Sequence, residues 1–147
     1  MTPHRRLLLI AVLAAVTGCS NLPTAPSISD IQAAQTNWTA HHLTRYAYQY
    51  MTTGFTTTFD GQAVRLVVIG DTVRSAQFVA TNDSVPVVPT TLRTVDSLFA
   101  LALATRQAGT LVSVQFDSAF GYPARMEISG FPSGTGVVTA SNIELLP

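Results

Sequence analysis

The sequence contains no lysine, so all of its positive side-chain charge comes from arginine. Two arginines lie in an N-terminal segment that we expect to be removed. The six others are scattered singly among eight carboxylates, which leaves a formal charge of about −2. Nucleic-acid binding requires clustered basic side chains that displace counterions from phosphates. The sequence therefore predicts that nucleic acid is not a partner.

Cysteine and histidine are also scarce. Cys19 is the single cysteine, so the chain cannot form an internal disulfide and must be stabilised by packing. Only His41 and His42 lie outside the N-terminal segment, and they are adjacent. A zinc site needs three or four ligands, and adjacent helical residues point about 100° apart. We therefore expect no metal site and no bound cofactor.

Long hydrophobic runs are absent as well. The longest, residues 7–16, follows His4, Arg5 and Arg6, and its ten residues are too few for a membrane-spanning helix, which takes roughly 20. A basic segment followed by an apolar run of this length is typical of a signal peptide. Residues 1–18 are therefore predicted to be a signal peptide, with a buried N-terminal helix as the alternative.

After the apolar run come Val16, Thr17, Gly18 and Cys19, an order that resembles the cleavage site of bacterial lipoprotein precursors. The resemblance implies that Cys19 carries a thioether-linked diacylglycerol and, after cleavage between Gly18 and Cys19, usually an amide-linked third acyl chain such as palmitate. Two or three acyl chains hold a protein firmly at a membrane. Ser20 after the cysteine favours the outer membrane if the host is Gram-negative. We therefore expect a lipid-anchored protein of the cell envelope, either in the periplasm or displayed at the cell surface.

The remaining 129 residues are enough for one domain with a hydrophobic core. Residues 19–28 contain prolines and serines and show no apolar periodicity. We interpret them as a lipid-anchored linker. Residues 29–147 are predicted to form a single domain.

Two segments have the pattern of helices. In the first, Ser29 is the predicted N-cap and Gln32 completes a capping box, so the helix is predicted over residues 30–43. The second follows Thr94 and covers residues 95–108, where apolar side chains recur at the spacing of one helical face. Each helix therefore has a predicted start at a polar capping residue.

Alternating and β-branched segments predict six strands. Gly70 and Asp71 are a turn signal between two of them, and the two prolines of residues 81–92 exclude that segment from a sheet interior. Residues 130–136 are predicted to be a glycine-rich loop. The predicted strands cover residues 44–53, 63–69, 73–80, 110–117, 124–129 and 137–145. The order α-β-β-β-α-β-β-β predicts an α+β fold, a mostly antiparallel sheet of about five to six strands with two helices on one face.

Several motifs follow one another in a specific order. Trp38 in the first helix precedes a strand with alternating tyrosines, Thr-Val-Asp-Ser-Leu-Phe at residues 94–99 opens the second helix, and Phe-Asp at 116–117 precedes Gly-Tyr-Pro at 121–123. Over roughly residues 34–146, this order resembles DUF6174, a family of small bacterial lipoproteins known only as a domain of unknown function. The resemblance implies this fold and supplies no activity.

The search for catalytic groups yields one carboxylate of interest. Asp117 ends a predicted strand just before the Gly-Tyr-Pro motif. It either forms a turn or acts with His41 or His42 as the acid/base pair of an envelope hydrolase, which would require a hydrogen bond between them. No Gly-x-Ser-x-Gly motif is present, and histidines near a helix C-terminus interact favourably with its dipole. We therefore predict that the protein is not an enzyme.

Tyrosines supply the other candidate residues. Tyr46, Tyr48 and Tyr50 share one face of a predicted strand. They form either a recognition surface or a packed layer under a helix with hydroxyls at its rim. Tyr122 either turns the chain at a corner or lines a cleft. These four tyrosines and Asp117 are the candidate surface or binding residues.

The sequence thus predicts a non-enzymatic binding or accessory module of the cell envelope. Its expected partners are the membrane, through Cys19, and an envelope protein or a small ligand. A structural or inhibitor-like module, with an exposed apolar patch or open sheet edge and no pocket, is the alternative. An envelope hydrolase is the third hypothesis.

Overall fold

The computed structural model describes residues 25–147, which form two helices and six strands. The elements are α1 (Ile28–Ala40), β1 (Arg45–Thr53), β2 (Val64–Ile69), β3 (Thr72–Phe78), α2 (Val95–Gln107), β4 (Leu111–Phe116), β5 (Pro123–Phe131) and β6 (Gly134–Leu145). The predicted signal peptide, its cleavage site at Gly18 and Cys19, and Ser20 lie outside the described residues.

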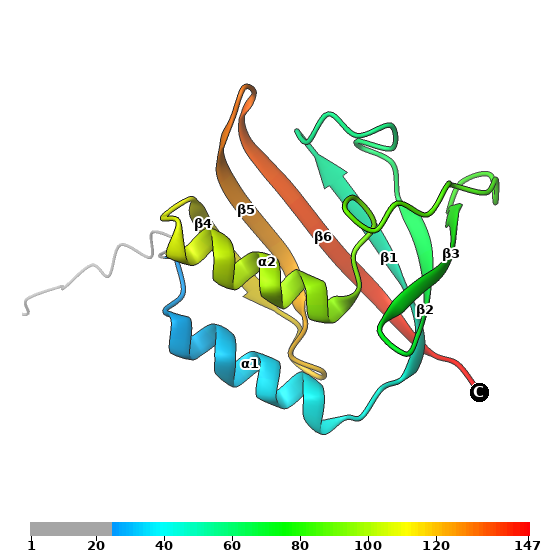
Figure 1. Cartoon of the computed structure of the whole chain (residues 1–147), viewed down its shortest axis with the longest axis horizontal. Helices are drawn as coiled ribbons and strands as arrows, with labels where there is room; N and C mark the ends of the chain where they lie inside the picture. The colour runs from blue at the N-terminus through cyan, green and yellow to red at the C-terminus, as the bar shows by residue number, and fades with distance from the viewer. Residues whose placement is uncertain (1–24) are drawn as a thin grey trace, which may run out of the picture.

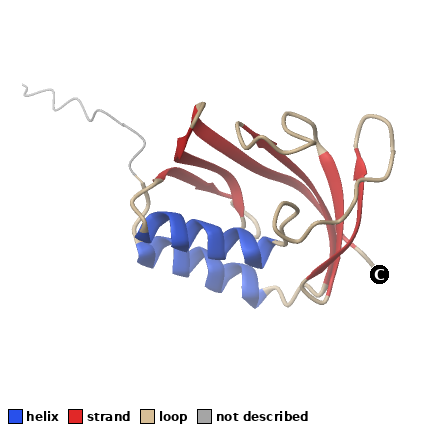
Figure 2. Ribbon diagram, turned by 45° about the horizontal axis from the view of Figure 1, so that its top comes forward, coloured by secondary structure: helices blue, strands red, loops and turns tan. Residues whose placement is uncertain are grey.

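The strands form one sheet in the order β3-β2-β1-β6-β5-β4, and every neighbouring pair is antiparallel. The first and last strands, β1 and β6, pair at its centre. Both helices cover the same face of the sheet (Figure 1, Figure 2). The predicted α+β class, the order of elements and the one-sided helix layer are therefore confirmed.

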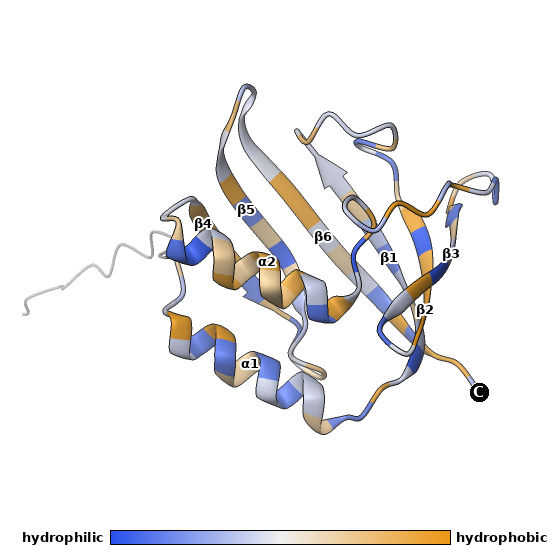
Figure 3. Ribbon diagram, viewed as in Figure 1, coloured by the Kyte–Doolittle hydropathy of each residue, from blue (hydrophilic) through white to orange (hydrophobic). Residues whose placement is uncertain are grey.

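The two helices contribute unequally to the core. In α1 only Ile31 and Trp38 are buried. In α2 the buried residues are Val95, Leu98, Phe99 and Ala102. Figure 3 shows the same contrast, because hydrophobic residues mark most of α2 while hydrophilic residues interrupt α1. We conclude that α2 is the main helix of the core and that α1 is held largely by its tryptophan.

The start of α1 differs from the prediction. Ser27, not Ser29, is the N-cap: its hydroxyl accepts a hydrogen bond from the Asp30 amide at 3.1 Å, and the Asp30 carboxylate accepts one from the Ser27 amide at 2.9 Å. The predicted capping box of Ser29 and Gln32 is therefore wrong. A carboxylate in the first helical turn also suits the helix dipole, which favours Asp30 over Gln32 as the capping partner. The helix thus begins inside the segment predicted to be linker.

The end of α1 also comes earlier than predicted. The helix ends at Ala40 rather than near Leu43. His42 adopts a φ of 52°, which lies in the left-handed region and cannot continue a right-handed helix. The two histidines therefore lie in the connection to β1.

The hairpin of β2 and β3 has the predicted turn. Gly70 and Asp71 both adopt positive φ, at 55° and 54°. Two such residues form the primed turn whose twist matches that of the flanking strands. The turn leaves the Asp71 side chain exposed at the tip of the hairpin.

The predicted loop over residues 130–136 is wrong, because β5 and β6 extend through it to a short turn. Gly136 explains part of this difference. A Cβ atom there would lie 2.6 Å from the Phe55 ring and 2.9 Å from the Phe131 ring. The two rings lie 4.5 Å apart. Glycine at this position is therefore needed for close packing rather than for a loop.

Candidate functional site

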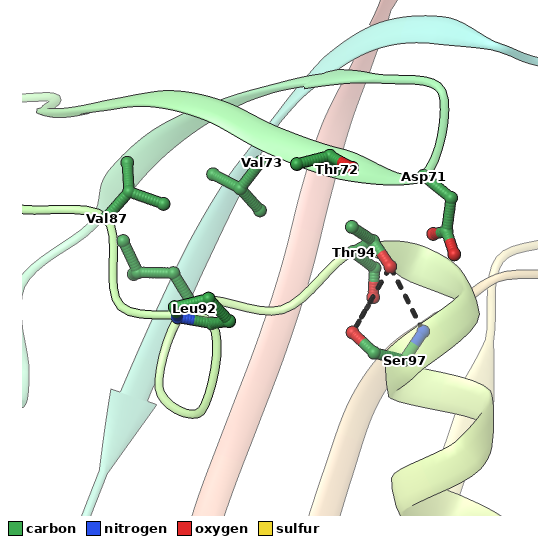
Figure 4. A pocket seen from close by; sticks show the side chains of 8 residues that line it. Asp71, Thr72, Val73, Val87, Leu92, Thr94 and Ser97 are labelled. Atoms are coloured by element: carbon green, nitrogen blue, oxygen red, sulfur yellow. Dashed lines mark hydrogen bonds between the residues drawn. The ribbon is translucent and has the colours of Figure 1, made fainter.

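A pocket of about 280 Å³ lies where the hairpin of β2 and β3 faces the N-terminus of α2 (Figure 4). The segment that connects β3 to α2 completes its wall. The lining residues are Asp71, Thr72, Val73, Val87, Pro89, Leu92, Thr94 and Ser97. The pocket thus brings residues 71–73 of the hairpin against residues 87–97, which form one continuous stretch of chain.

The pocket has an apolar side made by Val73, Leu92 and Val87. Val73 and Leu92 belong to the hydrophobic core, whereas Val87 is 38% exposed at the pocket mouth. Ligand pockets typically combine such an apolar lining with a few polar groups in fixed positions. A second hollow beside Phe78 and Val79 is lined without any charged side chain. The pocket near α2 is therefore the better candidate for specific binding.

The polar side of the pocket is the cap of α2. Thr94 is the N-cap, as predicted, and its hydroxyl accepts a hydrogen bond from the Ser97 amide at 3.2 Å. The Ser97 hydroxyl donates to the Thr94 carbonyl at 2.9 Å. These bonds fix both side chains, so the pocket presents oxygen atoms in defined positions (Figure 4).

The formal charges at the pocket are negative. Asp71 belongs to the lining, and Asp96 lies in the first turn of α2. Burial raises the pKa of Asp96, and the nearby charge of Asp71 raises it further, while a 3.5 Å hydrogen bond from the Trp38 indole opposes the shift. No basic side chain is among the lining residues. The pocket therefore favours a neutral hydrogen-bond donor or a cation over an anion.

The three tyrosines of β1 are core residues and do not form an exposed recognition surface. Tyr46, Tyr48 and Tyr50 are each 1% exposed. Their rings lie side by side, with centroids 6.0 and 6.4 Å apart. Because the helices cover this face of the sheet, the alternation of β1 places the rings inside. Of the two interpretations of this stripe, the structure supports packing and contradicts the surface.

The tyrosine hydroxyls hold the wall of the pocket. The Val95 amide donates to the Tyr46 hydroxyl at 3.1 Å, and the Tyr48 hydroxyl donates to the Arg93 carbonyl. Burial raises the pKa of Tyr50 to about 12, and the nearby charge of Arg93 opposes this shift. Two hydroxyls from the central strand thus form hydrogen bonds with the chain just before and at the start of α2.

The other end of the wall segment is fixed to the edge of the sheet. Gln77 and Ser84 form an isolated antiparallel bridge. The Val85 amide donates to the Ala76 carbonyl at 2.9 Å. Bonds at both ends therefore leave residues 86–92 as the span that closes the pocket.

Asp117 and Tyr122 lie in the turn between β4 and β5, apart from this pocket. Asp117 accepts hydrogen bonds from the amides of Ala119, at 3.0 Å, and Phe120, at 2.7 Å. Tyr122 is buried, and its ring packs edge-on against Trp38 with centroids 6.2 Å apart. Burial raises the pKa of Tyr122, and the charge of Asp117 adds to this. These contacts identify a turn-forming aspartate and a core tyrosine, and neither lines the pocket.

Close packing against α1 explains why the Gly-Tyr-Pro motif begins with glycine. Gly121 adopts a φ of 79°, and a Cβ atom there would lie 2.8 Å from the Asn37 amide nitrogen and 3.0 Å from the Ala34 carbonyl. The motif therefore lets this turn lie directly against α1.

The histidines do not join a catalytic arrangement in the part of the chain that is described. His41 packs on Phe120 with ring centroids 5.0 Å apart. Within residues 25–147, no hydrogen bond or ion pair connects either histidine to Asp117. The same residues contain no group of three histidines or carboxylates able to hold a metal ion. Across these residues, neither helix has the length and hydrophobicity needed to cross a membrane.

The pocket residues were not among the predicted site residues. Asp71 and Thr94 were predicted only as a turn residue and a helix cap. Their meeting depends on the docking of the hairpin against α2, which no local pattern encodes. The one usable signal was the proline-containing segment of residues 81–92, because loops so often carry binding residues.

Comparison with known proteins gives one match. A family model described as "Family of unknown function (DUF6174)" matches residues 30–133. The chain belongs to the DUF6174 family. Neither the curated proteins nor the solved structures contain a match to it. The DUF6174 match ends before β6 begins, yet β6 pairs with both β1 and β5. The sheet of this DUF6174 protein is therefore complete only with residues beyond the matched region.

Proposed function

We propose that this DUF6174 protein is a non-enzymatic binding module of the cell envelope, anchored through lipid on Cys19, with the pocket between the hairpin of β2 and β3 and the start of α2 as its ligand site. The pocket is the observation that carries the binding role. It combines an apolar side with fixed oxygen atoms and a carboxylate. The signal-peptide pattern and the cysteine after it support the anchor.

The chemistry of the lining narrows the ligand class. The apolar groups of Val73, Val87 and Leu92 suit a short aliphatic or small aromatic group. The Asp71 carboxylate, which lies on the side of Thr94 and Ser97 in the same pocket (Figure 4), suits an ammonium or guanidinium group. A small amine, or a basic side chain of an envelope protein, meets both requirements. A ligand of the same size that carries a carboxylate would be repelled.

The anchor is tested by comparing wild type with Cys19→Ala in a bacterial host that processes lipoproteins. Wild type is expected in the membrane fraction and labelled by a palmitate analogue, because the sulfur of Cys19 is the atom that receives the diacylglycerol. Cys19→Ala is expected to be unlabelled. Equal labelling of the two proteins, or no labelling of wild type, would contradict the anchor.

The pocket is tested by amide NMR of residues 25–147 with three probes of equal size: n-butylamine, n-butanol and butyrate. Butylamine is expected to shift the amides of residues 71–73 and 87–97 most, and butyrate least. Equal shifts by all three probes, or shifts centred on other residues, would contradict the proposed site.

A pair of variants controls for unspecific effects. Val87→Trp is expected to fill the mouth of the pocket and abolish the butylamine shifts. Val112→Trp changes a residue of similar exposure, 36% against 38%, on β4 and outside the pocket lining, and is expected to leave the shifts unchanged. If both variants lost the butylamine shifts, the shifts would not report binding in this pocket.

A further inference from the structure

The chain that leads into α1 is tied to the far end of α2. Arg106, in the last turn of α2, donates a hydrogen bond from Nε to the carbonyl of Pro26 at 2.7 Å. Figure 1 shows the start of α1 beside the C-terminal end of α2. The direction in which the chain leaves the domain is therefore set by a specific side chain and not only by the helix cap.

The pocket lies at the opposite end of the same helix. Thr94 lines it, and Arg106 lies twelve residue steps further along the chain. At 1.5 Å per residue these positions are about 18 Å apart along α2. The chain from Cys19 therefore joins the domain beside the C-terminal end of α2, and the pocket lies at the N-terminal end of the same helix.

Only a short stretch of chain lies between Cys19 and Pro26. Its seven residue steps span at most about 25 Å, even when fully extended. A lipid on Cys19 would therefore keep the start of α1 close to the bilayer. Two exposed aliphatic side chains belong to this end of the domain: Ile28 in the first turn of α1, 41% exposed, and Val112 near the start of β4, 36% exposed.

This end of the domain carries one charge of each sign, Asp30 in the first turn of α1 and Arg106 in the last turn of α2. Arg106 has no carboxylate partner among the ion pairs of the described residues, which are Arg65 with Glu144 and Arg125 with Glu127. A cation held near a bilayer is attracted to anionic head groups.

We propose that the end of the domain formed by the start of α1 and the C-terminus of α2 faces the bilayer, and that the bond between Arg106 and Pro26 sets this orientation so that the pocket opens away from the lipid. This inference rests on the proposed anchor at Cys19. It assigns the bilayer as the partner of this end and leaves the pocket accessible to a ligand in the aqueous compartment.

The orientation is tested by energy transfer on vesicles. The lipidated protein, purified from a bacterial membrane, is placed in phospholipid vesicles that contain an acceptor-labelled lipid. A donor dye is attached to Gln107→Cys, near Arg106, or to Val88→Cys, in the wall segment of the pocket. Because Cys19 is the only native cysteine and its sulfur would carry the lipid, each introduced thiol is unique. Both positions are exposed.

The Gln107 probe is expected to transfer energy at least about twofold more efficiently than the Val88 probe, because it lies nearer the bilayer by a distance comparable to the length of α2. Arg106→Ala is expected to bring this ratio toward one. Arg74→Ala, which removes an exposed arginine of β3, is the matched control and is expected to leave the ratio unchanged.

The possible outcomes separate the proposed orientation from the proposed anchor. Protein that floats with the vesicles but gives equal or inverted transfer would contradict the orientation and leave the anchor intact. Protein that does not float with vesicles would contradict the anchor and the orientation with it. The comparison of the two probe positions in the wild-type background needs no Arg106 variant, so it holds even if Arg106→Ala fails to fold. An unchanged ratio in a folded Arg106→Ala protein would contradict the role of the hydrogen bond.

Discussion

Replacing Tyr48 by phenylalanine tests the role of the tyrosine hydroxyls most sharply. Tyr48 is 1% exposed, and its hydroxyl donates to the carbonyl of Arg93 in the wall of the pocket. The variant keeps the ring and its packing but removes the donor. The bond is partly buried, and an acceptor that loses its partner where water cannot replace it costs about 1–3 kcal/mol. We therefore expect the free energy of unfolding of Tyr48→Phe to fall by about 2 kcal/mol.

The measurement is urea denaturation of residues 25–147, with the slope against urea expected to stay constant because the surface exposed on unfolding is unchanged. Tyr50→Phe is the matched control. It lies on the same face of β1 with the same 1% exposure, but no backbone group depends on its hydroxyl in the described residues, and the nearby Arg93 side chain is only partly buried and can be hydrated instead. We expect the free energy of unfolding of Tyr50→Phe to fall by less than about 1 kcal/mol.

Hydrogen exchange adds a local readout. If the hydroxyl of Tyr48 holds the wall of the pocket, exchange of the amides of residues 86–95 should accelerate in Tyr48→Phe more than that of β5 or β6. A Tyr48→Phe protein as stable as wild type, or no more destabilised than Tyr50→Phe, would refute this reasoning.

Three further predictions concern stability. Gly121→Ala is expected to lower the free energy of unfolding by about 1–3 kcal/mol more than Gly109→Ala does. Both glycines have positive φ, but only a Cβ atom at Gly121 would lie against α1. Urea midpoints of the two variants test this difference. Ser27→Ala is expected to lose about 0.5–2 kcal/mol, while Ser29→Ala stays near wild type, and the reverse order would show that the observed cap is misassigned. Because the pKa of Asp96 is raised in the folded protein, wild type should lose stability relative to Asp96→Asn as the pH rises above about 4. Thermal unfolding at a series of pH values tests this, and a difference that does not change with pH would contradict it.

Local signals were enough for much of the fold. The cap at Thr94 and the apolar spacing of α2 have few competing interpretations, and Gly70 followed by Asp71 specifies a two-residue turn. The start of α1 was harder to predict. Ser27 and Ser29 are each followed three residues later by a side chain that can accept a hydrogen bond, Asp30 or Gln32. The usual capping-box pattern favours Ser29 with Gln32, whereas the helix dipole favours Ser27 with Asp30, and the structure has the second pair.

The remaining features depend on contacts between distant segments. The alternation of Tyr46, Tyr48 and Tyr50 placed them on one face but could not say which face the helices cover. The candidate pocket depends on the approach of Asp71 to the start of α2. The strand positions at Gly130 and Gly134, where φ is 98°, looked like a loop because glycine is the usual loop residue. In each case tertiary packing, which local pattern does not contain, decided the outcome.

The mass of the N-terminal peptide of the protein extracted from membranes tests the anchor most directly. Our account predicts a peptide that begins at Cys19 and carries the added mass of diacylglycerol and an acyl chain. A peptide that begins at another residue, or an unmodified Cys19, would contradict the anchor on which the proposed place of this protein in the cell envelope depends.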